Sequence, residues 1–549
     1  MKLKRSDLHH MSLVKLKRRD LLRMSLGELK RRDLLRMSLV LALQPWLQPL
    51  ARAAGAAPRW RGNPFTLGVA SGQPRPDGMV LWTRLVPEFE GNPDPSQREM
   101  VMVSYEIYSD EALRQPVQRG QVTTGAGRAH SVHVDVRGLR PDRPYWYRFT
   151  SGDAVSPVGR TRTAPAADAP VQRLRLALAS CQHYEQGWFV AHREIAQQDL
   201  DLVLFVGDYI YESSNPGHKV APGVREHTHG VPRTLDGYRQ RYALYKSGPD
   251  LQAAHAAHPW VVTWDDHEVV NDYAGEQDAR GTDTAVFLQR RAAAYQAYFE
   301  HMPVRLGPEP AGSATMRIYD RIAWGQLADL WTLDCRQYRS PQACPDPLRG
   351  GGRMVLGCDT LVEPQRTMLG AAQERWLGEG LVASRRAWKI VAQATQISPT
   401  GIDSPLGRTT YTDAWDGYPA ARSRLLQTVS DAGLADVVTL GGDVHMNVAA
   451  QLRLQPNDER SPVLASEFVT TSISSRGMSE TVLERIRAGN PDIVHARADE
   501  RGYTRVEVTP QGVSAEFRTT AYPALADARL NTQARFAVAR GRAGVQKAG

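Results

Sequence analysis

The sequence predicts an α/β fold preceded by an all-β domain, and three observations carry this prediction. From about residue 173 onward, apolar runs of strand length alternate with helical segments, as in residues 200–206 (LDLVLFV). Such continuous runs are typical of strands buried on both faces of a parallel sheet. Several of these runs are followed directly by acidic, histidine or cysteine residues. In open α/β sheets, ligands bind at the carboxyl ends of the strands. Between residues 60 and 163 the apolar pattern instead alternates in short segments, as in β-sheet domains.

The N-terminal segment differs from the rest of the chain in its charge. Residues 1–53 contain 13 of the 68 Lys and Arg residues but only 4 of the 59 Asp and Glu residues, so the remainder has no net charge. The formal charge of +9 therefore belongs to the leader. The net charge of the remaining chain therefore does not indicate a nucleic-acid-binding surface.

The leader contains a tandem repeat whose last copy holds Arg31 and Arg32, followed by an apolar stretch and small residues up to Ala56. This order is typical of an export signal, and the arginine pair resembles a twin-arginine signal, although Lys30 stands where Ser or Thr is usual. A basic amphipathic helix on a membrane surface is the alternative. We predict that the leader, residues 1–56, is cleaved after export by the twin-arginine machinery, with cleavage after Ala53 as the alternative to cleavage after Ala56. The product would be periplasmic or secreted, with no stable membrane span.

Residues 60–163 are expected to form a sandwich resembling an immunoglobulin or fibronectin type III domain. Alternating segments recur at 101–108, 131–136 and 145–149, with turn residues between them. Residues 164–170 (APAADAP) then predict a linker to the next domain.

Residues 173–524 are expected to form the α/β domain, and residues 525–549 a helical, basic tail. The predicted elements of the domain include a helix at 187–198, a helix at 284–301 that Pro303 ends, sheet at 317–334 and a strand at 388–394.

Four strand ends offer side chains that bind metals. They carry Cys181, Asp208 with Tyr211, Asp266 with His267, and Asp443 with His445. A carboxylate at a central strand end, such as Asp208, can bridge two metals in a phosphoryl-transfer site. A thiolate and a phenolate favour a strongly Lewis-acidic transition metal, whereas acidic oxygens suit a hard cation such as Ca²⁺. The ligand types therefore make a mixed pair, iron beside calcium, chemically reasonable.

Four short segments contain these strand ends: residues 179–182 (ASCQ), 207–212 (GDYIYE), 264–268 (WDDHE) and 441–445 (GGDVH). They resemble the motifs of PhoD-type alkaline phosphatases, which are phosphodiesterases and phosphomonoesterases of the calcineurin-like metallophosphoesterase superfamily. Flanking segments at 65–72, 81–85, 333–339 and 467–475 are also similar. The resemblance spans nearly the whole body and implies a double β-sheet flanked by helices.

The resemblance also implies roles for individual residues. The Fe³⁺ ligands would be Cys181, Asp208, Tyr211 and His445, with Asp208 shared by Ca²⁺. Asp266 and Asp443 would serve the calcium side, which holds one or two ions, and Asn271 is a further candidate there. His267 takes the place of the superfamily's catalytic histidine, where it can protonate the leaving alkoxide or stabilise phosphoryl charge. A metal-bound hydroxide or oxide would attack phosphorus in line, so Asp208 and His267 are expected to carry catalysis.

Some neighbouring residues have a structural alternative to a functional role. Arg336 is a candidate phosphate clamp, with an ion pair to Asp334 as the alternative. Tyr209 is expected to pack rather than to bind metal. Asp265 and Glu268 are expected either to orient His267 or to solvate a loop.

The cysteines suggest an oxidising compartment. Cys344 and Cys358 bracket a loop rich in Pro and Gly, and we favour a disulfide between them, with Cys335–Cys344 as the rival pairing.

These observations favour an exported metal-dependent hydrolase that cleaves small phosphate monoesters and diesters for phosphate scavenging. A phospholipase D-like diesterase acting on lipid headgroups is the alternative within the same fold. An alternative of another class is a surface binding module with a structural metal site.

Overall fold

The chain divides into Met1–Ala57 and a compact unit, Pro58–Gly549. The structure, a computed structural model, describes residues 59–88, 100–214, 224–307, 312–346, 348 and 350–548. The predicted leader and its arginine pair lie outside the described residues. No helix in the described part of the chain is long and apolar enough to cross a membrane.

A ten-stranded sheet forms the first layer of the compact unit. Its central strands β9 (Leu174–Ala179), β10 (Leu202–Val206) and β11 (Pro259–Thr263) are parallel, and β10 and β11 are buried along their whole length. Four antiparallel strands extend it beyond β9: β22 (Glu500–Val508), β23 (Gly512–Ala521), β24 (Asn531–Ala539) and β25 (Gln546–Ala548). The apolar run at 200–206 is thus a buried central strand, as predicted.

A seven-stranded sheet forms the second layer. Its order is β12 (Asp320–Trp324), β13 (Ala328–Thr332), β15 (Trp388–Ala392), β18 (Val437–Gly441), β20 (Val463–Val469), β19 (Asn447–Arg453) and β21 (Ile493–Arg497). Leu204 and Val206 of the first sheet pack with Leu440 and Phe468 of the second in one buried apolar cluster. This is the double sheet that the family resemblance implies.

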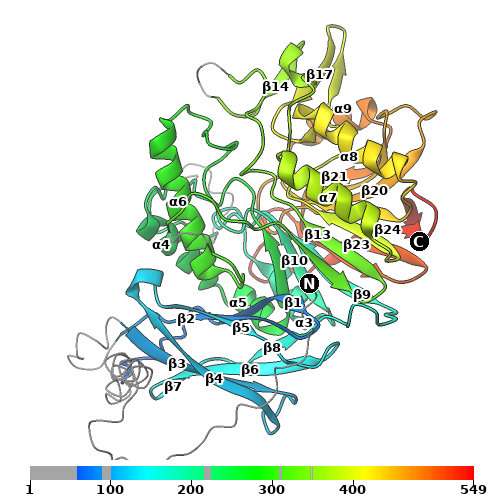
Figure 1. Ribbon diagram of the computed structural model, residues 1–549. Helices are drawn as coiled ribbons and strands as arrows, with labels where there is room; N and C mark the ends of the chain where they lie inside the picture. Colours follow the sequence, from blue (N-terminus) through cyan, green and yellow to red (C-terminus); the bar gives the residue numbers. More distant parts are fainter. Residues whose placement is uncertain are drawn as a thin grey trace, which may run out of the picture. The chain divides into compact units, whose positions relative to one another are not determined.

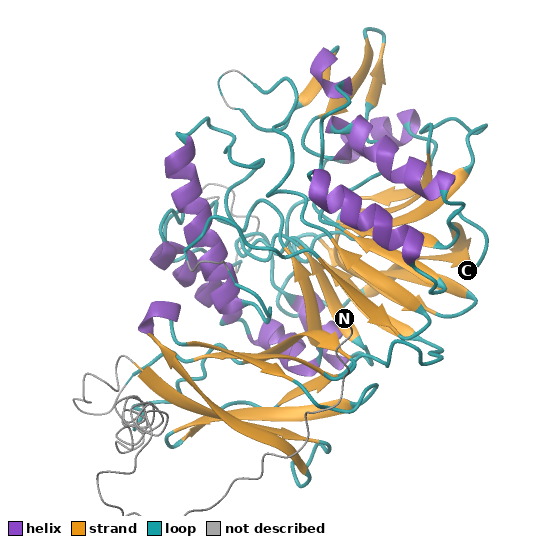
Figure 2. Cartoon of the chain, viewed as in Figure 1, coloured by secondary structure: helices purple, strands orange, loops and turns teal. Residues whose placement is uncertain are grey.

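Helices cover the outer faces of both sheets (Figures 1 and 2). The first sheet carries α3 (Val190–Gln197), α4 (Leu235–Lys246), α5 (Pro249–Ala257) and α6 (Thr284–His301), and the second carries α7 (Ala371–Ala383) and α8 (Pro419–Asp431). A further helix, α9 (Glu480–Gly489), packs beside β21. The α6 helix has the predicted bounds, because Asp283 accepts the N–H groups of its first turn and Pro303 follows its end.

The N-terminal region is all-β, as predicted, but it shares a sheet with the α/β core. One layer consists of β3 (Met100–Tyr108), β4 (Pro116–Gly125), β6 (Pro144–Ser151), β7 (Ala154–Val155) and β8 (Gly159–Arg162). The facing layer consists of β1 (Val69–Arg75), β2 (Gly78–Arg84) and β5 (Ser131–Val136). Because β1 pairs in parallel with β11, with Ser71 opposite Pro259, this layer is the far end of the ten-stranded sheet.

The C-terminal segment is extended, so the helical tail predicted for residues 525–549 is wrong. There β24 pairs with β23, and β25 pairs with β24. Phe536 and Val538 alternate with more exposed neighbours and enter the apolar cluster between the sheets. The period of two and the available edge of β23 outweigh the helical propensity of this stretch.

A small three-stranded sheet extends from the second layer (Figure 1). It consists of β14 (Met354–Leu356), β17 (Gly407–Tyr411) and β16 (Ile402–Ser404). Beside it a disulfide joins Cys344 to Cys358, the pairing that the sequence favours. Cys181 and Cys335 are buried and free.

Candidate metal centre

The predicted ligands follow the carboxyl ends of strands in both sheets. Cys181, Asp208 and Asp266 follow β9, β10 and β11 of the first sheet, and Asp443 follows β18 of the second. Cys181 and Asp208 both have φ of 58°, Asp443 has 65° and His445 has 53°. Non-glycine residues rarely adopt this left-handed region, and such strain gathers at functional sites.

The four side chains predicted to hold iron converge. Ligand atoms of Cys181, Asp208 and His445 lie within 4.8 Å of one another. The Tyr211 hydroxyl lies 2.9 Å from Oδ2 of Asp208 and 3.0 Å from Nε2 of His445. A thiol, a carboxyl, a phenol and an imidazole therefore face one point from strand ends far apart in the sequence.

Asp208 also belongs to two further groups of possible metal ligands. One contains Asp266 and His267, and the other contains Asp265 and Asp443, again with ligand atoms within 4.8 Å. Only Asp208 is shared by all three groups, which is the position that a bridging carboxylate requires. Asp265, which the sequence suggests either orients His267 or solvates a loop, is thus among the possible ligands.

A fourth acidic group adjoins the others and was not anticipated. It consists of Asp266, Asp272 and Asp413, and Asp413 lies after β17 in the second half of the chain. Nothing in the sequence around Asp413 distinguishes it, because only the fold brings it beside Asp266.

Several groups of the donor set are not satisfied within the protein itself. Oδ1 of Asp266 is buried and has no hydrogen-bond partner in the described structure. Burial, and then Asp208 and Asp443, raise the pKa of the Cys181 thiol well above its ordinary value. Burial also raises the pKa of Asp443 to about 7, although Arg336 opposes the shift. Bound cations would replace these retained protons and satisfy the carboxylates, so the residues fit a metal centre.

His445 is oriented for ligation by a backbone carbonyl. Its Nδ1 donates to the carbonyl oxygen of Arg476 over 2.7 Å, which leaves Nε2 with its lone pair toward the centre. Metal-binding histidines are commonly fixed in this way. Ser475 supports the neighbouring phenol, because its hydroxyl donates to the Tyr211 oxygen over 2.9 Å.

His267 is held by Glu212, which sequence reasoning missed. Its Nδ1 lies 2.6 Å from Oε2 of Glu212, and both side chains are largely buried. Burial disfavours the imidazolium, but Glu212, Asp208 and Asp266 together outweigh it and raise the pKa of His267 well above its ordinary value. Glu212 and the neighbouring aspartates therefore favour the protonated form of His267. The position of Glu212 within the 207–212 motif is the one signal that could have pointed to it.

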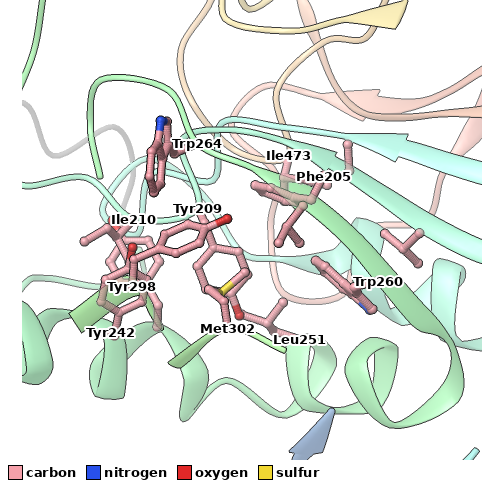
Figure 3. Close-up of a cluster of buried hydrophobic side chains, with 14 of the residues drawn as sticks. Phe205, Tyr209, Ile210, Tyr242, Leu251, Trp260, Trp264, Tyr298, Met302 and Ile473 are labelled. Carbon is pink, nitrogen blue, oxygen red and sulfur yellow. The ribbon is translucent and has the colours of Figure 1, made fainter. Parts of the chain in front are cut away.

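The two tyrosines of the motif have different surroundings, as predicted. Tyr209 lies in the aromatic core with Phe205, Trp260 and Tyr298 (Figure 3), and its hydroxyl lies 2.7 Å from Nε2 of His255. Tyr211 instead faces the metal ligands. The alternation along this loop therefore separates a packing residue from a candidate ligand.

Arg336 has a role other than the two that the sequence suggests. Its guanidinium is buried, makes a bidentate contact with Asp265, and lies 2.8 Å from Asp413 and 3.4 Å from Asp266. Only its backbone N–H donates to Asp334. A direct phosphate clamp is not supported, since carboxylates occupy the guanidinium.

Asn271 lies at the edge of the centre. It is exposed, and its backbone N–H donates to Oε1 of Glu212 over 3.0 Å. Its place as a calcium ligand stays a prediction.

Comparison with known proteins gives this geometry a context. A profile of the PhoD-like phosphatase family matches residues 176–517, and one of the N-terminal domain of PhoD-like phosphatases matches residues 51–165. The chain belongs to the PhoD-like phosphatase family. Alkaline phosphatase D of Bacillus subtilis (strain 168) is 41% identical over 497 residues, covering 90% of this chain and 84% of that protein. A solved structure of PhoD shows a TM-score of 0.82 and 40% identity, with 90% of this chain and 94% of that chain covered.

This PhoD-like phosphatase is a phosphoric ester hydrolase. Its acidic, cysteine and histidine clusters are candidate metal sites at the strand ends of the family's fold. The alternative of a binding module without catalysis is therefore excluded.

Proposed function

We propose that this PhoD-like phosphatase is an exported hydrolase of phosphate monoesters and diesters that works with one Fe³⁺ and one or two Ca²⁺ ions. The observation that carries the proposal is the convergence of Cys181, Tyr211 and His445 on Asp208, with Asp266 and Asp443 alongside. Thiolate and phenolate donors favour a Lewis-acidic transition metal, and the carboxylates suit calcium. A bound metal pair supplies Lewis acidity toward the phosphoryl group and an activated water.

The protein's own residues would divide the remaining work. Asp208 would join the two sides of the centre, and the left-handed backbone aims its carboxylate there. His267, held by Glu212, would donate a proton to the departing alkoxide or stabilise phosphoryl charge. Arg336 would hold Asp265 and Asp266 in place and balance their charge.

Hydrolysis of two chromogenic esters tests the proposal. The purified protein, supplied with iron and calcium, should release p-nitrophenol from p-nitrophenyl phosphate and from its bis-ester. Asp208→Asn should abolish both activities, because it weakens the shared ligand. Failure of the metal-supplied wild-type protein to cleave either ester would overturn the proposal.

Export is supported by the leader and by the Cys344–Cys358 disulfide, since disulfides persist in oxidising compartments. The full chain should be processed and found outside the cytoplasm, and replacing Arg31 and Arg32 by lysine should retain the precursor inside. Processing that does not depend on the arginine pair would rule out the twin-arginine route.

One observation favours the lipid-headgroup alternative as a second candidate. Met354 and Leu356 are 44% and 45% exposed, and Leu406 of the adjoining turn is 83% exposed. Gly352, two residues before β14, donates its N–H to Asp272 of the acidic group, so the base of this small sheet adjoins the centre. Phosphatidic acid released from phospholipid vesicles would support this candidate, and its absence from chromatographed digests would reject it.

A further inference from the structure

The Glu268 carboxylate accepts hydrogen bonds from backbone N–H groups at two of the strand ends that carry the proposed metal ligands. Its side chain is buried, with 1% exposure. Oε2 accepts the N–H of Asp208 over 3.1 Å and that of Asp265 over 2.9 Å, while Oε1 accepts the N–H of Tyr209 over 2.6 Å. We propose that Glu268 is a positioning residue that sets the backbone of Asp208, and with it the place of the shared carboxylate.

The chain needs such an acceptor at this point. The pairing of β10 with β11 ends at Val206 and Thr263, so the N–H groups beyond lie outside the β ladder. Gly207 has φ of +105°, and a Cβ there would lie 2.6 Å from Cβ of Asp265, which shows how closely the two loops approach. Buried N–H groups without partners are costly, and one carboxylate satisfies three of them.

The same contacts account for the strained conformation of Asp208. A left-handed backbone is unfavourable for a non-glycine residue unless its surroundings determine it. Glu268 holds the N–H groups on both sides of the Asp208 Cα, those of Asp208 and Tyr209, and so determines its direction. Because Oε2 also holds Asp265, a single side chain connects the Asp208 loop to the loop that carries Asp266 and His267.

The two roles expected for Glu268 from the sequence do not apply. It does not orient His267, because Glu212 holds the Nδ1 of that residue. It does not solvate a loop, because it is buried. The remaining alternative is that Glu268 only stabilises the fold. An experiment has to separate that role from positioning of Asp208.

Glu467 provides a matched control within the same protein. It is buried with 0% exposure, and its two oxygens accept the N–H groups of Ile397 over 2.7 Å and of Ser398 over 2.8 Å. Glu467 therefore joins backbone segments by the same chemistry, but neither Ile397 nor Ser398 is a candidate ligand. Glu268→Gln and Glu467→Gln make the same change in the two places.

The test compares Ca²⁺ and Fe³⁺ binding to the full-length wild-type protein, Glu268→Gln and Glu467→Gln, alongside their melting temperatures. Glutamine has one acceptor oxygen, and its amide hydrogens oppose one of the backbone N–H groups. Glu268→Gln should weaken metal binding about 10- to 100-fold, as loss of a ligand's supporting contact commonly does. Glu467→Gln should lower the melting temperature but leave metal affinity unchanged.

Wild-type affinity in Glu268→Gln, or an equal loss of affinity in Glu467→Gln, would overturn the inference. If Glu268→Gln does not fold, Glu268→Asp keeps the acceptors on a shorter side chain and should show an intermediate loss, whereas unchanged affinity there would also overturn it. The inference rests on the proposed function only in taking Asp208 as a metal ligand. A wild-type protein that binds both metals but cleaves no ester would refute the proposed activity and leave this comparison intact.

Discussion

At the scale of single residues, the centre brings together groups that are unfavourable when buried alone. A buried thiol, a buried phenol and several buried carboxyls each lose solvation, and their mutual repulsion adds to the cost. Asp208 shows this most clearly, because burial and the neighbouring carboxylates raise its pKa well above the ordinary value despite the nearby His267. Bound cations would offset the cost of burying these groups together.

Loss of the His267 side chain should slow catalysis more than it weakens substrate binding. His267→Gln removes the proton donor, and general acid catalysis typically contributes about 10²–10⁴-fold. Steady-state kinetics with an alkyl phosphate such as glycerol phosphate, whose alkoxide needs a proton to leave, should show a kcat lowered by about that factor, with KM little changed. Glu212→Gln should give a smaller loss, because the imidazole remains but loses its carboxylate partner at 2.6 Å. A rise in KM with unchanged kcat in either variant would contradict these roles.

At the scale of elements, the turns after the strands determine where the candidate ligands lie. Buried strands, α6 and the disulfide were predictable because apolar runs, capping residues and turn-rich loops are local signals. Four motifs likewise pointed to the candidate ligands. The sequence did not reveal Glu212, Asp413 or the contacts of Arg336, because those pairings join residues 55 to 77 positions apart. The sequence did not predict β24 as a strand, because its extended conformation comes from pairing with β23 and not from its own propensity.

Gly207→Ala should disrupt the centre through the close approach of two loops. Gly207 combines φ of +105° with a would-be Cβ 2.6 Å from Asp265 Cβ, whereas Gly433 has φ of +57° and open space around it. Both alanine variants incur backbone strain, but only Gly207→Ala adds overpacking, which typically costs about 1–3 kcal/mol. Urea unfolding should therefore show a larger loss of stability in Gly207→Ala, together with loss of bound metal. Equal losses in the two variants would contradict the close approach.

At the scale of the whole molecule, the centre connects the two sheets. Cys181, Asp208 and Asp266 belong to strand ends of the ten-stranded sheet, while Asp443 and His445 follow a strand of the seven-stranded sheet. Metal bound among them would therefore tie the layers together and stabilise the folded state by mass action.

Metal removal should lower the melting temperature and also introduce a pH dependence. In the metal-free protein, burial raises the pKa of Asp443 and of Asp272 to about 7. The folded state then keeps protons that the unfolded chain has released above about pH 4, so stability falls as pH rises through this window. Calorimetry should show the melting temperature of the metal-free protein falling between about pH 4 and pH 7 and levelling off above that range. The metal-loaded protein should lack this trend, and an identical trend in both forms would contradict the role of these carboxylates.

The visible absorption spectrum of the iron-loaded protein tests the central claim most directly, because a phenolate bound to Fe³⁺ gives a charge-transfer band. The wild-type protein and Tyr209→Phe should both show the band, since Tyr209 packs in the core. Tyr211→Phe should lose it, because this change removes only the hydroxyl 2.9 Å from Asp208 and 3.0 Å from His445. A band that persists in Tyr211→Phe, or its absence from the iron-loaded wild-type protein, would contradict the claim that Tyr211 is an iron ligand.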